Sequence, residues 1–243
     1  IRPTLLLLLS LIFVAASVYV HNDIQDVDMD QENEVKKNRA IASGKVRIED
    51  ARILVYLFGL IGLGLAWLVN IYSFGFIFAY FILFYFYSHP QVKLKNRFLG
   101  KDLTLFIAYP ILCFAANFAI TNKISPLAVQ CSLLTGVYVL TQGPVANEAS
   151  DMVEDKKYGV KSISTMLSWR SKVQFMILGI LAQIVLLPLI QIQYGVNLLL
   201  PIFSISVLLL TLASLRPLLG QYNLSDFNKV QNISTLYMIV LPL

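Results

Sequence analysis

Long apolar runs separated by short polar segments make up most of this chain. Eight runs have membrane-spanning length or come close to it. They cover residues 3–21, 51–69, 72–88, 103–121, 126–146, 172–192, 197–215 and 231–243. The pattern predicts an all-α fold, a polytopic transmembrane helical bundle with eight helices in this chain.

The composition supports a multi-span membrane protein and excludes a soluble domain. Apolar residues make up 57% of the chain and charged residues 14%. The net charge of +5 does not indicate a nucleic-acid partner, because the basic residues lie in a few loops beside the apolar runs. Cys113 and Cys131 fall inside apolar runs, so they suggest neither a disulfide framework nor a zinc site.

The connections between the runs alternate in charge. Those after the first, third, fifth and seventh runs carry Lys and Arg, whereas the others are short and almost uncharged. The positive-inside rule therefore places the basic connections on the cytoplasmic face and residue 1 on the far side. If the intact protein starts in the cytoplasm, one more helix precedes Ile1, which gives nine.

One carboxylate pattern, N-[DE]-x-x-D-x-x-x-D, occurs twice, at the ends of the first and fifth runs. The first copy consists of Asn22, Asp23, Asp26 and Asp30, and the second consists of Asn147, Glu148, Asp151 and Asp155. The spacing of i, i+4 and i+8 places three of the four side chains on one side of a helix. The repeat suggests one domain built from two related halves, about 1–121 and 126–243.

Acidic residues beside a bilayer are costly and mark a functional site by default. Several like charges on one helical face repel one another unless a cation binds between them. Ligand sets of oxygen alone suit Mg²⁺ or Mn²⁺, and Mg²⁺ is usually shared between protein carboxylates and substrate phosphates. The two motifs and the Lys and Arg that follow them therefore predict a divalent-metal site for a diphosphate with a lipid tail, such as a prenyl diphosphate.

Several further motifs resemble the UbiA superfamily of intramembrane prenyltransferases. Besides the two aspartate motifs, the chain has N-R-A-I-A-S-G at 38–44, then Tyr87-Ser88-x-Pro90 followed by Leu94-Lys95-x-Arg97, and Asp155-Lys156-x-x-Gly159. These motifs cover most of the chain in the family's order. The resemblance implies a single domain over 1–243, with nine helices in the intact protein around a central cavity open to the cytoplasmic face.

The resemblance also implies Mg²⁺-dependent transfer of a prenyl group and a role for each motif residue. The metal ligands and their neighbours are expected to be Asn22, Asp23, Asp26, Asp30, Glu148, Asp151 and Asp155. The diphosphate contacts are expected to be Arg39, Lys93, Lys95, Arg97 and Lys156. Tyr87 is expected near the reacting carbon, so that the catalytic set is Asp26, Asp30, Asp151, Asp155 and Tyr87. By this resemblance, the family's first helix is expected to be missing from this chain.

The expected partners are a prenyl diphosphate donor, membrane lipid and a hydrophobic or aromatic acceptor. That acceptor is a quinone precursor or a glycerol phosphate, in quinone or membrane-lipid biosynthesis, and no obligate protein partner is expected. Two alternatives stay open, a divalent-cation transporter and a non-catalytic prenyl-diphosphate-binding protein. His21 and His89 are interpreted as hydrogen-bonded interfacial histidines rather than general bases.

Overall fold

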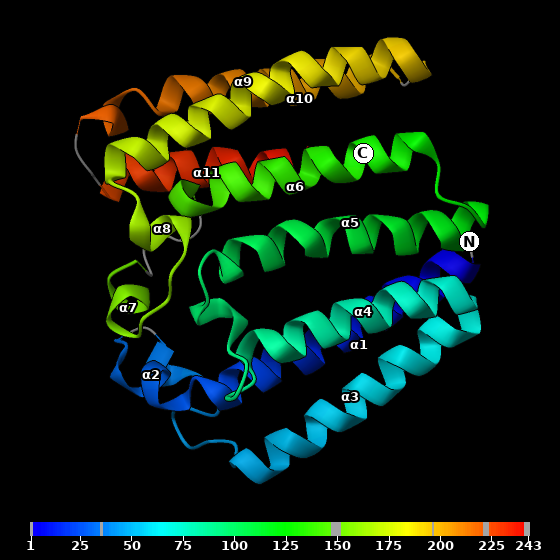
Figure 1. The fold of residues 1–243 in the computed structure, drawn as a ribbon, viewed down its shortest axis with the longest axis vertical. Coiled ribbons are helices and arrows are strands. Elements are labelled where there is room, and N and C mark those ends of the chain that lie inside the picture. Colours follow the sequence, from blue (N-terminus) through cyan, green and yellow to red (C-terminus); the bar gives the residue numbers. More distant parts are fainter. Residues whose placement is uncertain (1, 35, 147–151, 196, 221–223, 241–243) are drawn as a thin grey trace. The chain divides into compact units, whose positions relative to one another are not determined.

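The computed structural model describes residues 2–34, 36–146, 152–195, 197–220 and 224–240, and the regular structure of these residues is helical throughout (Figure 1). The chain divides into two compact units, Ile1–Ala128 and Val129–Leu243. Each unit is described separately below.

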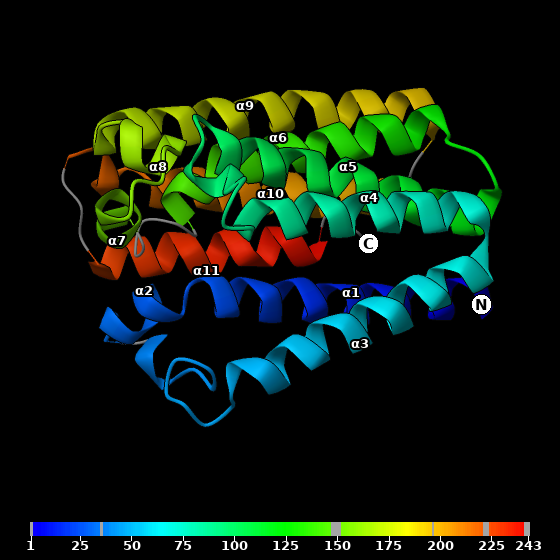
Figure 2. The same cartoon turned by 60° about the horizontal axis from the view of Figure 1, so that its bottom comes forward.

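The first unit is a bundle of four long helices with short helical segments between them. Its elements are α1 (Arg2–Gln25), α2 (Val27–Glu32), η1 (Lys36–Asn38), α3 (Ile48–Val69), α4 (Ile71–Ser88), η2 (Leu94–Asn96) and α5 (Gly100–Thr121). Helices α3 and α4 both pack against α1, and α5 packs against α4 (Figure 2). The Asn70 side chain fixes the start of α4 by accepting a hydrogen bond of 2.7 Å from the backbone N–H of Ser73.

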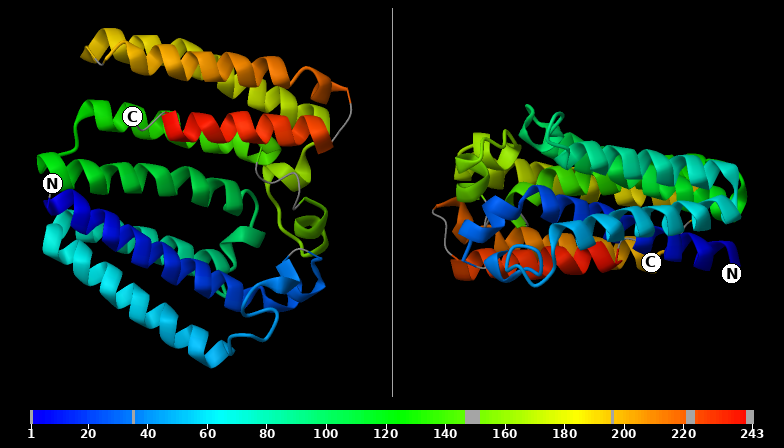
Figure 3. Two further views of the ribbon diagram at one scale, coloured as in Figure 1. Left: turned by 180° about the vertical axis from the view of Figure 1, so that it is seen from behind. Right: turned by 90° about the horizontal axis from the view of Figure 1, so that it is seen from below.

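The second unit contains the C-terminal helices, and its boundary falls in the first turn of α6. The elements are α6 (Pro126–Ala146), α7 (Met152–Lys157), α8 (Ile163–Met166), α9 (Trp169–Tyr194), α10 (Leu199–Ser214), η3 (Pro217–Leu219) and α11 (Leu224–Val240). Helix α10 packs against both α9 and α11 (Figure 3). A capping box between Ser162 and Thr165 starts α8.

The structure confirms the all-helical fold and contains a helix in each of the eight predicted apolar runs. The expected count of eight is corrected to eleven α-helices in the described residues, because α2, α7 and α8 form in polar connections that carry no long apolar pattern. Five of the described helices, α1, α3, α4, α5 and α9, are long and apolar enough to cross a membrane. Helix α10 is apolar but has only 16 residues.

Small residues let α1 and α3 approach closely. Ser10 Oγ donates a hydrogen bond of 2.7 Å to the Gly62 carbonyl, and Ser17 Oγ donates one of 2.7 Å to the Val55 carbonyl. A Cβ added to Gly62 would lie 2.6 Å from Cγ2 of Val14. Small residues and interhelical hydrogen bonds are the usual means of packing helices in a membrane, where apolar burial alone gives little preference for protein over lipid.

We expect Gly62→Ala and Gly64→Ala to change stability in opposite directions. The new methyl at residue 62 meets Val14 and the Ser10 backbone, whereas nothing lies within 4 Å of a Cβ at residue 64. Overpacking typically costs about 1–3 kcal/mol, and alanine in place of an exposed helical glycine gains up to about 1 kcal/mol. Thermal unfolding in detergent measures both, and equal midpoints for the two variants would contradict the close α1–α3 contact.

Candidate active site

The first aspartate motif lies where α1 gives way to α2. The helix is interrupted at Asp26, whose backbone dihedrals are φ −104° and ψ 10°. The hydrogen bonds of the turn nevertheless continue, from Asp26 N–H to the Asn22 carbonyl at 2.9 Å and from Asp30 N–H to the Asp26 carbonyl at 2.8 Å. The i, i+4, i+8 stripe predicted for Asn22, Asp26 and Asp30 therefore continues across the interruption.

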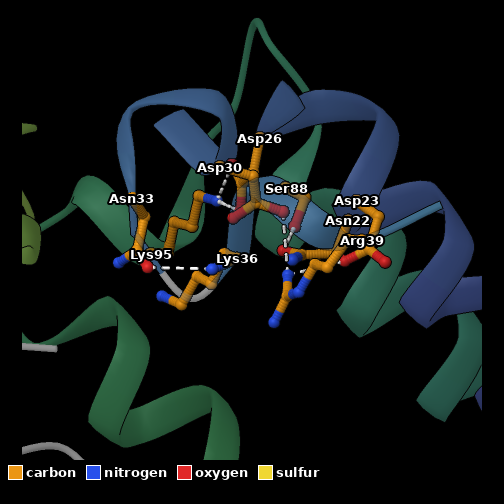
Figure 4. A network of polar contacts seen from close by, with 9 residues as sticks. All are labelled: Asn22, Asp23, Asp26, Asp30, Asn33, Lys36, Arg39, Ser88 and Lys95. Carbon is orange, nitrogen blue, oxygen red and sulfur yellow. Dashed lines mark hydrogen bonds and ion pairs between the residues drawn. The ribbon is translucent and has the colours of Figure 1, made fainter. Parts of the chain in front are cut away.

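Two basic side chains from distant parts of the first unit bind the carboxylates of this motif (Figure 4). Arg39 Nη1 lies 2.9 Å from Asp23 Oδ1 and 2.9 Å from Asp30 Oδ2. Lys95 Nζ contacts both carboxylate oxygens of Asp26. Arg39 follows η1 and Lys95 is part of η2, so two loops bring together cations and carboxylates that are far apart in sequence.

Ser88 is a member of this network to which the sequence assigned no role. Its fully buried hydroxyl donates a hydrogen bond of 2.6 Å to Oδ1 of Asn22 and so fixes the orientation of that amide. Ser88 is the last residue of α4. Its place in the Tyr87-Ser88-x-Pro90 segment, between an apolar run and a basic loop, is the sequence signal that could have identified it.

Asp30 has the chemistry of a cation ligand. Its Oδ2 accepts from Arg39, but its buried Oδ1 has no hydrogen-bond partner among the described residues. Burial raises the pKa of the Asp30 carboxyl above its usual value, and the nearby Arg39 guanidinium opposes this shift. Because buried polar atoms are rarely left unsatisfied, a bound cation is a suitable partner for Oδ1.

The predicted metal ligands of the first motif are close together, but their side chains are not arranged as a metal-coordination site. No three His, Cys, Asp or Glu side chains of the described residues are grouped closely enough to hold a metal ion. The physical reason is visible in the network, where Arg39 draws Asp23 and Asp30 toward itself and Lys95 holds Asp26. In this conformation two of the protein's own cations offset most of the charge of the three carboxylates.

Three other predicted residues lie near this network in sequence. Tyr87 is on α4, next to Ser88, and its ring is 5.8 Å from that of Phe84. Lys93 is exposed and has a left-handed backbone conformation, with φ 42°. Arg97 is also exposed and donates from Nε to the Val92 carbonyl at 3.2 Å.

The structure describes only part of the second motif. Asn147, Glu148 and Asp151 lie outside the described residues. Asp155 is buried on α7, and its carbonyl accepts a hydrogen bond of 2.9 Å from the Val160 backbone N–H. Of the residues predicted for this half, Asp155 and Lys156 are therefore the two that the structure locates.

A basic pocket of about 490 Å³ lies beside this part of the second motif. Lys156, Lys157 and Lys172 line it together with Trp169. The buried Lys172 ammonium donates to the Ser164 carbonyl at 2.8 Å and lies 5.5 Å from the Trp169 ring centroid. The sequence indicated no role for Lys172 and did not predict that it is fully buried.

Comparisons with known proteins point to one family. The sequence profile described as the UbiA prenyltransferase family matches residues 1–236. A digeranylgeranylglyceryl phosphate synthase from Sulfurisphaera tokodaii is 25% identical over 93% of this chain and 78% of its own length. A protoheme IX farnesyltransferase from Acinetobacter baylyi is 42% identical over a shorter stretch, 35% of this chain and 30% of its own length.

A solved structure shares the fold. The structure of a UbiA homolog from Archaeoglobus fulgidus bound to DMAPP and Mg²⁺ superposes with a TM-score of 0.77, covering 99% of this chain and 86% of that one. The sequence identity is 17%, so this likeness concerns the fold alone.

Proposed function

The chain belongs to the UbiA prenyltransferase family, and from this premise we propose that it transfers a prenyl group from a polyprenyl diphosphate to a glycerol-phosphate acceptor and releases diphosphate, with Mg²⁺ as its cofactor. It is an integral membrane protein with several membrane-spanning helices. The observation that carries the proposal is the network around the first aspartate motif, where carboxylates and cations meet and the buried Oδ1 of Asp30 has no partner among the described residues.

The residues of this network suit a metal-bound diphosphate. Asn22, Asp26 and Asp30 offer oxygen atoms alone, which is the ligand chemistry of Mg²⁺. We assign Asp151 and Asp155 the same role in the second motif, with Asp23 and Glu148 as neighbours, on the basis of the repeated pattern. Mg²⁺ at these residues would withdraw charge from the diphosphate and make it a better leaving group.

The basic residues have a complementary task. When a diphosphate is present, Lys95 and Arg39 can bind its phosphate oxygens in place of the aspartate carboxylates. Carboxylates and phosphates form charge-assisted hydrogen bonds of similar strength with these side chains. We assign Lys93, Arg97 and Lys156 to further phosphate contacts. In the reaction the bond between the prenyl carbon and the diphosphate oxygen breaks, the acceptor oxygen bonds to that carbon, and the acceptor's proton passes to the released diphosphate or to water.

The aromatic residues of α4 are suited to stabilising the allylic cation that remains when the diphosphate leaves. Phe84 and Tyr87 lie near the motif end of this helix, and the Tyr87 ring provides a π face for an allylic cation close to the leaving group. Apolar surroundings also exclude water, which would otherwise react with the cation. We therefore propose Tyr87 as the residue nearest the reacting carbon.

A glycerol-phosphate acceptor is favoured because the relative that matches along most of the chain is named for digeranylgeranylglyceryl phosphate synthesis. The match to the protoheme farnesyltransferase covers about a third of the chain and supports the donor chemistry more than the acceptor. The active site is proposed to face the cytoplasm, on the basis of the basic connections beside both motifs.

We expect Lys95→Gln to raise the KM for the prenyl diphosphate about tenfold to a hundredfold, because hydrogen bonds to charged groups contribute about 1.5–3 kcal/mol. Lys93→Gln, in the exposed part of the same loop, is expected to cost less because its ammonium is not directed to the motif by an ion pair in the described structure. Steady-state kinetics in detergent compare the two. Equal losses would show that the Asp26 pair does not position Lys95 for the substrate.

The function is tested by measuring diphosphate release from geranylgeranyl diphosphate by the purified protein, with Mg²⁺ and with EDTA. Acceptors are a prenylated glycerol phosphate, haem and an aromatic quinone precursor. Mg²⁺-dependent release with the glycerol phosphate alone is the expected result. Release with another acceptor would overturn the acceptor assignment, and Mg²⁺ flux into liposomes without any transfer would favour the cation-transporter alternative.

A further inference from the structure

A second polar pocket, of about 190 Å³, lies between α1, α3 and α4 in the first unit. The polar and aromatic residues that line it are His21 and Gln25 of α1, Arg52 and Tyr56 of α3, and Tyr85 and His89 at the end of α4. All belong to the ends of these helices that carry the aspartate network. The pocket has the volume of a small headgroup rather than of a lipid chain.

This pocket is distinct from the candidate active site. Successive residues of an α-helix are rotated by about 100°, so His21, Ile24 and Gln25 share one face of α1, while Asn22 and Asp26 point to a neighbouring face, roughly 120° further round the helix. The contacts agree, because Asn22 and Asp26 bind Ser88 and Lys95, whereas His21 stacks on Tyr85 with a ring-centroid distance of 4.6 Å. The pocket therefore lies on a different face of α1 from the side chains of the first motif.

One buried polar atom in this pocket lacks a partner. The His21 side chain is 8% exposed, and its Nε2 forms no hydrogen bond within the described part of the chain. A ring nitrogen is a donor or an acceptor depending on the tautomer. A hydroxyl group satisfies both cases, because it donates and accepts, so a ligand hydroxyl is the natural partner for Nε2.

The charge of the pocket favours an anion. Arg52 is exposed at the mouth and forms no ion pair among the described residues, whereas nearby Arg47 is bound to Asp50 at 2.8 and 2.9 Å. None of the described residues that line the pocket is a carboxylate. A guanidinium that is not neutralised by a neighbour is a typical phosphate-binding group.

The surroundings favour an anion attached to a lipid. Helix α3 also carries exposed apolar side chains near the pocket residues in sequence, namely Ile53, Leu57 and Leu60. Tyr56 is also exposed, as tyrosines are at the boundary between lipid and water. A headgroup in the pocket would thus leave its acyl chains against an apolar helical surface that crosses the membrane.

We propose that this pocket binds the glycerophosphate headgroup of an anionic membrane lipid, with Arg52 on the phosphate and His21 Nε2 on a headgroup hydroxyl. The bound headgroup connects α1 to α3 and α4 at the end where the first motif begins. The ligand stabilises the first unit by mass action, because it binds the folded helices and not the separated ones. This proposal does not depend on the acceptor assigned above.

The test is a thermal-unfolding titration of the purified protein with short-chain phosphatidylglycerol, in detergent and without prenyl diphosphate. The lipid is expected to raise the melting temperature of the wild type and of the control Arg47→Gln. Arg52→Gln should need about tenfold more lipid or more, since a charge-assisted hydrogen bond is lost. His21→Phe, which retains a ring against Tyr85, should also respond less.

Two further ligands identify the source of the phosphate. Short-chain phosphatidylcholine, which is zwitterionic, is expected to give little shift. If free glycerol phosphate gives the same Arg52-dependent shift at the same concentration, the ligand is a soluble phosphate and the lipid assignment is overturned. A shift by phosphatidylglycerol that is equal in the wild type, Arg52→Gln and His21→Phe would overturn the site itself.

Discussion

Asp26→Asn is expected to lower diphosphate release about a thousandfold, which corresponds to about 4 kcal/mol of transition-state stabilisation. Asp26 lies at the centre of the first motif, its carboxylate is largely buried, and both of its oxygens contact Lys95. Asparagine keeps the size of the side chain but removes the charge with which, in the proposed function, Asp26 holds a cation. Single-turnover assays with saturating donor and acceptor measure the chemical step directly.

Asp28→Asn is the matched control for this variant. Asp28 is in the same short segment and carries the same charge, but its side chain is exposed and faces away from the Asn22, Asp26 and Asp30 stripe. We expect its turnover to stay within about twofold of the wild type, as for surface changes away from a site. If both variants lost activity equally, the loss would reflect the overall charge of the segment rather than a ligand at residue 26.

Asp155→Asn is expected to cause a loss of similar size, and the double variant tests whether the two motifs act as a unit. If Asp26 and Asp155 serve the same diphosphate, removing both should cost little more than removing one, because groups that act together are strongly non-additive. Independent roles would multiply the two losses to about a millionfold. The same single-turnover assay separates these outcomes, with circular dichroism as the control for folding.

The long helices could be predicted from the sequence because each coincides with a run of apolar residues of membrane-spanning length or close to it. Each of the eight apolar runs contains a helix among its described residues, and the first helix extends to Gln25, which carries it into the aspartate motif. The short helices α2, α7 and α8 could not be predicted in this way, because they are four to six polar or mixed residues held by local hydrogen bonds. Helical pattern analysis needs more turns than these segments provide.

The charged residues of the candidate site could be predicted from the sequence, but the ion pairs that they form with one another could not. The motif spacing indicated that Asn22, Asp26 and Asp30 share a stripe, and the resemblance indicated Arg39 and Lys95 as partners of an anion. That Lys95 would bind Asp26 itself, across 69 residues of sequence, depends on how the loop after α4 folds. The burial of Ser88 and Lys172 could not be predicted, because a single polar residue near a helix end is usually solvated.

The internal pairing of the first motif has a thermodynamic consequence for the order in which ligands bind. Asp23, Asp26 and Asp30 are largely balanced by Arg39 and Lys95, so the resting protein attracts neither free cations nor free anions strongly. A diphosphate that draws the two basic side chains away leaves the carboxylates bare and raises their affinity for a cation. Linkage is reciprocal, so the cation must raise the affinity for the diphosphate by the same factor. The resting charge balance thus favours joint binding of the cation and the diphosphate and opposes binding of either one alone.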